Sequence, residues 1–197
     1  MDLFTLLFWL AQAMVVAVRL PHGLRARRQG VASSSPSALD SSLLVLANAG
    51  MYGLPLLDLS TDWLDWADYG RPVLLGWLGV ALLGGGMWLF WCSHRDLGVF
   101  WSPSLQLRQG HRVIRVGVYR RIRHPMYAAT FLICLAQACL LDNWLAGASG
   151  ALAFALFYAL RIDLEEAMLL VNFGDEYRAM MQQAGRLWPL LGTVRSG

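Results

Sequence analysis

The chain has 197 residues, of which 57% are hydrophobic and only 15% are charged, and its net charge is +3. A composition this apolar is typical of a protein with several membrane-spanning segments, rather than of a soluble domain with a large core. The small net charge, with arginines that cluster beside apolar runs, argues against nucleic-acid binding.

Apolar runs occur along the whole chain, and each approaches the length of about 20 helical residues that a bilayer core requires. They are Leu3 to Leu20, Leu39 to Leu57, Pro72 to Cys92, Met126 to Leu141 and Trp144 to Leu160. The sequence therefore predicts an all-α polytopic membrane protein with about five transmembrane helices. We expect residues 1–197 to form a single membrane-embedded domain, in which residues 93–197 are the motif-bearing catalytic half.

The arginines are distributed unevenly between the connecting segments. Most follow the first run, lie between the third and fourth runs, or follow the fifth run, whereas the opposite side has only Arg71. By the positive-inside rule the N-terminus is outside and the C-terminus is cytoplasmic. This orientation fits an integral protein of the bacterial inner membrane whose active site faces the cytoplasm.

Two features of the sequence carry no predicted chemistry. The segment from Gly30 to Ser42 has the composition of a flexible cytoplasmic linker. The cysteines Cys92, Cys134 and Cys139 fall inside apolar runs and lack the CxxC or Cys/His spacing of a metal site, so no metal is predicted.

The most polar stretch of the chain precedes the fourth apolar run. Residues His111 to Tyr127, HRVIRVGVYRRIRHPMY, contain five arginines, two histidines and two tyrosines. Arginines beside a membrane helix often only fix topology or contact lipid headgroups. A second polar cluster, Arg161 to Glu166, follows the fifth run, and its Arg161 and Glu165 share a helix face because they stand four residues apart.

Only Asp142 and Asn143 separate the last two apolar runs. A connection this short forces the two helices to be antiparallel and in contact, so their cytoplasmic ends are neighbours. The two polar clusters are therefore predicted to form one cytoplasmic site built from loops and helix ends. Within it, Pro125 suits a first helical turn and fixes His124 at a helix N-terminus, where free N–H groups favour a negatively charged ligand group.

Both clusters carry motifs of a known family. The pattern H-x-V-x-x-x-G-x-Y-x-x-x-R-H-P-x-Y, from His111 to Tyr127, resembles the isoprenylcysteine carboxyl methyltransferase family. The pattern R-x-x-x-E-E-x-x-L followed by F-G-x-E-Y, from Arg161 to Tyr177, is similar to the same family. The two motifs, in this order around an apolar hairpin, cover roughly the C-terminal half of the chain.

This resemblance implies a membrane enzyme that transfers a methyl group from S-adenosyl-L-methionine to a lipophilic acceptor, such as a carboxylate of an isoprenylcysteine-like or other lipid substrate. It implies that Arg161 binds the substrate carboxylate, and that Arg161 and Glu165 are the catalytic residues. The cofactor-binding residues that it implies are His111, Arg112, Val113, Ile114, Tyr119, His124, Pro125, Met126, Tyr127 and Glu165.

The residues alone leave other functions open. No GxGxxG pattern is present, so a cofactor site would be made from loops and helix ends rather than from a doubly wound domain. The acceptor of a methyltransferase could equally be a phospholipid amine or a small thiol. A membrane reductase that uses NADPH, or a non-catalytic membrane protein that binds anionic lipid through its arginines, are further alternatives. The sequence assigns no oligomeric state.

Overall fold

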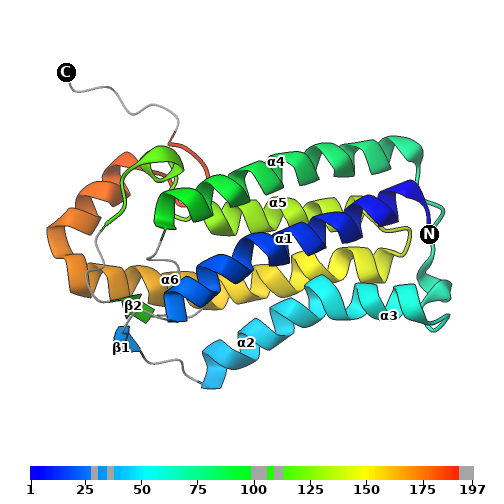
Figure 1. Cartoon of the computed structure of the whole chain (residues 1–197), viewed down its shortest axis with the longest axis horizontal. Helices are drawn as coiled ribbons and strands as arrows, with labels where there is room; N and C mark the ends of the chain where they lie inside the picture. The colour runs from blue at the N-terminus through cyan, green and yellow to red at the C-terminus, as the bar shows by residue number, and fades with distance from the viewer. Residues whose placement is uncertain (28–30, 35–37, 99–105, 109–112, 191–197) are drawn as a thin grey trace.

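The computed structural model describes residues 1–27, 31–34, 38–98, 106–108 and 113–190 (Figure 1). Its helices are α1 (Leu3–Arg27), α2 (Ala38–Asn48), α3 (Leu54–Ser60), α4 (Val73–Leu97), α5 (Pro125–Leu140) and α6 (Trp144–Gln183), and its strands are β1 (Val31–Ser34) and β2 (Gln106–Arg108). A π-helical turn, Ala49–Gly53, joins α2 to α3, and 3-10 turns lie at Asp65–Ala67 and Gly117–Arg120.

The long helices lie side by side along the long axis of the molecule, which confirms the predicted all-α membrane fold (Figure 1). In the part of the chain that the structure describes, four helical segments are long and apolar enough to cross a membrane, namely Leu3–Pro21, Asp40–Ser60, Val73–Leu97 and Trp144–Gln183. The shorter α5 is the fifth apolar helix. The small β1–β2 pair, with Val31 opposite Arg108, lies at the end of the bundle away from the N-terminus (Figure 1).

Local sequence signals set the ends of α4. Pro72, in an extended conformation, precedes its first turn, and Gly98 ends it with a positive φ of 58°. Glycine is the residue that adopts this left-handed conformation at least cost.

Helix α6 continues well beyond the length that a membrane requires. Its 40 residues would span about 60 Å at 1.5 Å per residue, about twice the thickness of a bilayer core. Gly174 interrupts it with φ 50° and ψ −122°. After this kink the chain turns back toward the bundle (Figure 1).

The predicted α5–α6 hairpin is confirmed. Asn143 is the N-cap of α6, and its side-chain oxygen accepts a hydrogen bond from the Ala146 amide at 3.0 Å. Its side-chain nitrogen donates to the Leu64 carbonyl and to Asp68. The hairpin therefore has a capped start, and it is bonded to the loop that follows α3.

Two buried apolar clusters meet on α5. One packs α5 against α1 and α4, and includes Phe8, Phe90 and Ile133. The other packs α5 and α6 against α2, through residues such as Met51 and Phe154. Helix α5 therefore lies between the two clusters, and α2 packs against the hairpin that α5 forms with α6.

A polar contact reinforces the packing of α2 on the hairpin. The buried Gln137 side chain donates to the Gly50 carbonyl at 3.0 Å and to the Ala146 carbonyl at 2.8 Å. Ser149 also donates to the Gly50 carbonyl, at 2.7 Å. In an apolar environment these bonds satisfy the Gly50 carbonyl, which the π-helical turn leaves without a regular partner.

The interpretation of Gly30 to Ser42 as a featureless linker is wrong for its described residues. Val31–Ser34 forms strand β1, and α2 begins at Ala38. The strand exists because Gln106–Arg108, distant in the sequence, supplies its pairing partner. The composition of a segment does not reveal a pairing strand that lies far away in the sequence.

We predict that Gly50→Ala destabilises the bundle. A Cβ at Gly50 would lie 2.5 Å from the Ser149 carbonyl oxygen and 2.7 Å from the Ala153 Cβ, so α2 and α6 would have to separate. The expected loss is about 1–3 kcal/mol, measured as a lower unfolding temperature in detergent. Gly84→Ala is the matched control, because a Cβ there meets nothing within 4 Å. Equal unfolding temperatures for the two variants would contradict the prediction.

Candidate functional site

The two polar clusters meet at the end of the α5–α6 hairpin that is remote from the N-terminus. The Glu165 carboxylate lies 3.6 Å from His124 Nδ1 and accepts a hydrogen bond from the Tyr127 hydroxyl. These groups come from segments about 40 positions apart, and the hairpin brings them together. The structure therefore brings the two polar clusters together.

His124 is held between two carboxylates. It is the N-cap of α5, with Pro125 at the first helical position, as predicted. Its buried ring has Nδ1 near Glu165 and has Nε2 3.2 Å from Glu166 Oε1. The ring thus contacts two acids of the protein itself, whereas the sequence alone indicated an anionic ligand group at this helix end.

The surroundings of His124 raise the pKa of its imidazole above the ordinary value. Burial acts to lower the pKa of His124, but the hydrogen bonds and the charges of Glu165 and Glu166 outweigh burial. A protonated imidazole can donate to both carboxylates, whereas a neutral ring can donate only one hydrogen bond.

Glu166 is the centre of a second group of contacts. Its side chain is 5% exposed and accepts from Arg123 Nε at 3.1 Å and from Arg186. The backbone around the two arginines is also paired, because the Arg123 amide donates to the Gly185 carbonyl at 2.8 Å and the His124 amide donates to the Arg186 carbonyl at 3.0 Å. Glu166 therefore fastens the segment before α5 to the segment after α6.

Arg161 lies next to Glu165 and is almost fully buried. Its Nη1 donates to Asp40 Oδ1 at 2.9 Å, and its Nε lies 3.6 Å from Glu165 Oε2. The guanidinium also lies over the Phe157 ring, 5.0 Å from the ring centre. Sequence reasoning missed Asp40, since it lies in the stretch interpreted as a linker and 121 positions from its partner.

The loop before α5 contributes Tyr119, which is buried. Burial, followed by the charges of Glu165 and Asp96, raises the pKa of the Tyr119 hydroxyl, so it stays protonated. The motif residue Gly117 has φ 54°, and a Cβ there would collide with the Asp96 carboxylate, which accepts from the Val118 amide at 3.0 Å. Glycine is thus required at this position by both conformation and space.

The remaining predicted cofactor residues are placed as follows. Val113 and Ile114 pack against an apolar cluster that contains Tyr119, Tyr177 and Met180. Pro125 is buried and Met126 half-buried, both in the first turn of α5. His111 and Arg112 lie outside the described residues.

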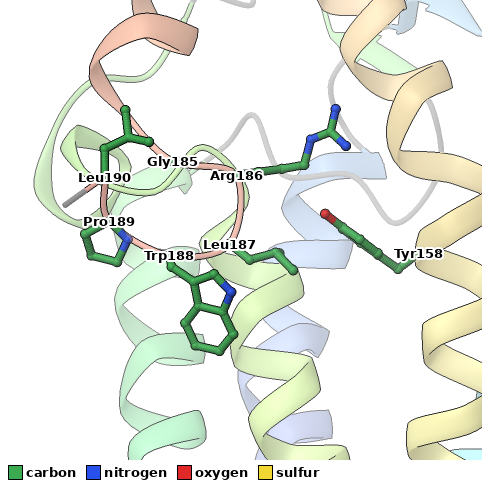
Figure 2. Close-up of a pocket in the computed structure, with 7 residues that line it drawn as sticks. All are labelled: Tyr158, Gly185, Arg186, Leu187, Trp188, Pro189 and Leu190. Atoms are coloured by element: carbon green, nitrogen blue, oxygen red, sulfur yellow. The ribbon is translucent and has the colours of Figure 1, made fainter.

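An open groove of about 460 Å³ includes Arg186, which binds Glu166. The groove is lined by Tyr158, Gly185, Arg186, Leu187, Trp188, Pro189 and Leu190. Figure 2 shows Tyr158 extending from α6 toward the loop that carries Arg186 and Leu187. Tyr158 also packs edge-on against Tyr127, with ring centres 5.6 Å apart. The groove is therefore one aromatic residue away from the Tyr127–Glu165 contact.

Carboxylates and cations lie next to one another in this site. Three carboxylates, those of Asp40, Glu165 and Glu166, contact three guanidiniums, those of Arg123, Arg161 and Arg186. Such a cluster can hold a ligand that carries both signs of charge, because each ligand group can pair with a residue of opposite sign.

We predict that stability depends on pH through His124. Because the folded-state pKa of His124 is raised, its contribution is fully present below the ordinary histidine pKa of about 6.5 and is lost as the pH rises through the raised value. The unfolding temperature of the detergent-solubilised protein should therefore fall over this range. His124→Gln should lack this component, so the difference between the two curves isolates His124. Parallel curves would contradict the assignment.

Comparisons with known proteins agree with this geometry. A model of the isoprenylcysteine carboxyl methyltransferase (ICMT) family matches residues 77–171. The chain is 36% identical over 85 residues to the human protein-S-isoprenylcysteine O-methyltransferase. The matched region covers 43% of this chain and 30% of the human protein. The chain is 28% identical over 170 residues to the nickel-cobalt-cadmium resistance protein NccN of Alcaligenes xylosoxydans xylosoxydans, which covers 84% of this chain and 75% of that protein.

The fold is also similar to a solved structure. The eukaryotic intramembrane Ras methyltransferase ICMT superposes with a TM-score of 0.52 at 26% identity, and the match covers 80% of this chain and 54% of that chain. The present chain thus spans about half of that protein. Its apolar helices and these matches show a membrane-integral protein. Together the family match, the relatives and the shared fold show that this chain is similar to proteins of the isoprenylcysteine carboxyl methyltransferase family.

Proposed function

We propose that this protein is an integral membrane methyltransferase that transfers a methyl group from S-adenosyl-L-methionine to a lipophilic acceptor. The observation that carries the proposal is the contact of Glu165 with His124 and Tyr127, which joins the two family motifs in one buried polar site. The names of the human relative and of the similar structure support the same reaction.

The residues present fit this cofactor, which supplies an activated methyl group on a sulfonium sulfur. The Glu165 carboxylate suits the ammonium group of the cofactor, since its side chain is 24% exposed while its neighbours in the cluster are buried. Tyr127 and the apolar residues Val113 and Ile114 suit the adenine ring. The proposed cofactor-binding residues are those that the family motifs imply: His111, Arg112, Val113, Ile114, Tyr119, His124, Pro125, Met126, Tyr127 and Glu165.

Methyl transfer to a carboxylate makes modest demands on the protein. A carboxylate is already ionised at neutral pH, because the pKa of an ordinary carboxyl group is about 4, so no general base is needed. Alignment of the acceptor oxygen with the methyl group contributes most to the rate. Arg161, held over Phe157, is the proposed residue that orients the acceptor carboxylate, and Arg161 and Glu165 are the proposed catalytic residues.

The groove beside Tyr158 suits the apolar part of the acceptor. It is lined mainly by apolar side chains, and Trp188 in its wall is 67% exposed. Only the Tyr158 ring would separate an amphiphile in this groove from Tyr127, because the two rings pack edge-on. We place the site on the cytoplasmic side of a bacterial inner membrane, with the N-terminus outside, on the distribution of the arginines.

A second candidate acceptor is an amine, as on a phospholipid headgroup. The observation in its favour is that Arg161 already has two carboxylate neighbours, Asp40 and Glu165. These two carboxylates leave Arg161 little capacity for a further anion, so a cationic acceptor group suits this corner of the site better than an additional anion. Mass spectrometry of lipids from cells with and without the protein separates the two acceptors, since only the amine acceptor gives a methylated headgroup.

We predict that Glu165→Gln weakens the binding of S-adenosylhomocysteine about ten- to a hundredfold, because charge-assisted hydrogen bonding of about 1.5–3 kcal/mol is lost. Isothermal titration calorimetry of the detergent-purified protein measures this. Asp175→Asn is the matched control, since that carboxylate is 95% exposed and pairs only with Arg178 among the described residues. A non-catalytic protein that binds anionic lipid would show no binding of this ligand to either variant or to the wild type.

A further inference from the structure

Asp40 is the one acid of the cluster that belongs to neither family motif. It lies in the first turn of α2, and its side chain is only 4% exposed. It also lies outside residues 77–171, the part that the family model matches. A carboxylate this deeply buried is costly unless a cation neutralises it, so its pairing with Arg161 is a requirement of the fold at this position.

Arg161 lies between two carboxylates at unequal distances. Asp40 accepts a hydrogen bond from Nη1 at 2.9 Å, whereas Glu165 lies 3.6 Å from Nε, beyond hydrogen-bond distance. The Phe157 ring below the guanidinium fixes the plane in which it lies. The guanidinium is therefore held toward α2 rather than toward its helical neighbour Glu165.

Glu165 keeps other partners in this arrangement. Its Oε2 accepts from the Tyr127 hydroxyl, and its Oε1 lies 3.6 Å from His124. Its side chain is also the more accessible of the two acids, at 24% exposed against 4% for Asp40. An approaching cation can thus reach Glu165 and not Asp40.

We infer that Asp40 is a positioning residue: by binding Arg161 it keeps this guanidinium beyond hydrogen-bond distance of Glu165, so that the Glu165 carboxylate remains available for a closer contact with a cationic ligand group. The inference rests on the proposed function, in which that group is the cofactor ammonium. Without the Asp40 charge, a buried Arg161 needs another anion. Glu165 is the nearest one, because residues four apart on a helix face each other.

The test is a double-mutant cycle read by ligand binding, which does not require the acceptor. Asp40→Asn keeps the shape of the side chain and removes its charge. We expect it to weaken S-adenosylhomocysteine binding about tenfold, or about 1.4 kcal/mol. In an Arg161→Gln background no guanidinium competes for Glu165, so there Asp40→Asn should change the affinity less than about twofold. Arg161→Gln alone should keep the affinity of the wild type within about threefold.

The cycle separates positioning from a merely structural role when it is read together with the unfolding temperature in detergent. A loss of affinity that is matched by a fall in the unfolding temperature would overturn the inference, as would an unchanged affinity in the wild-type background. If Asp40→Asn does not fold, Asp40→Glu decides. Its longer acid pushes Arg161 toward Glu165 and is expected to weaken binding about threefold, whereas an unchanged affinity would overturn the inference. Absence of binding to the folded wild type at millimolar ligand would instead overturn the proposed function.

Discussion

The buried carboxylate of Glu166 is the contact on which the end of the bundle remote from the N-terminus depends. It lies 5% exposed and is shared by Arg123, Arg186 and the ring of His124. An ionised group at such a position is stable only when cations surround it. The segments before α5 and after α6 must therefore come together around Glu166, and in doing so they set the ring of His124 beside Glu165.

The two acids of this adjacent pair have different surroundings as a result. Glu166 is neutralised by two arginines and holds the backbone in place. Glu165, one position earlier, faces Tyr127 and remains partly accessible. Helical geometry turns adjacent residues by about 100°, so neighbours in the sequence can serve the fold and the ligand separately. The same logic applies to Arg161, whose charge is fixed by Asp40 from another helix.

Local patterns in the sequence predict the elements of this site well, and long-range partners poorly. The two residues Asp142 and Asn143 suffice to predict that both polar clusters meet, because a short connection leaves the helices no other arrangement. Gly174 and Pro125 likewise mark real helix boundaries. Asp40 could not be predicted as a site residue, since its partner is 121 positions away and its neighbours have the composition of a linker. Strand β1 was missed for the same physical reason, because its hydrogen bonds go to Gln106–Arg108.

The shortness of α5 determines the depth of the site. Arg71, just before α4, donates to the Leu140 carbonyl and to Asp142, so the start of α4 is level with the end of α5. Helix α5 has 16 residues and α4 has 25, which leaves the other end of α5, where Pro125 lies, about 13 Å short of that of α4. The polar pocket is consequently recessed into the bundle. An amphiphile could be modified there while its chains stay among their neighbours in the leaflet, which avoids an extraction cost of about 0.8 kcal/mol for every methylene.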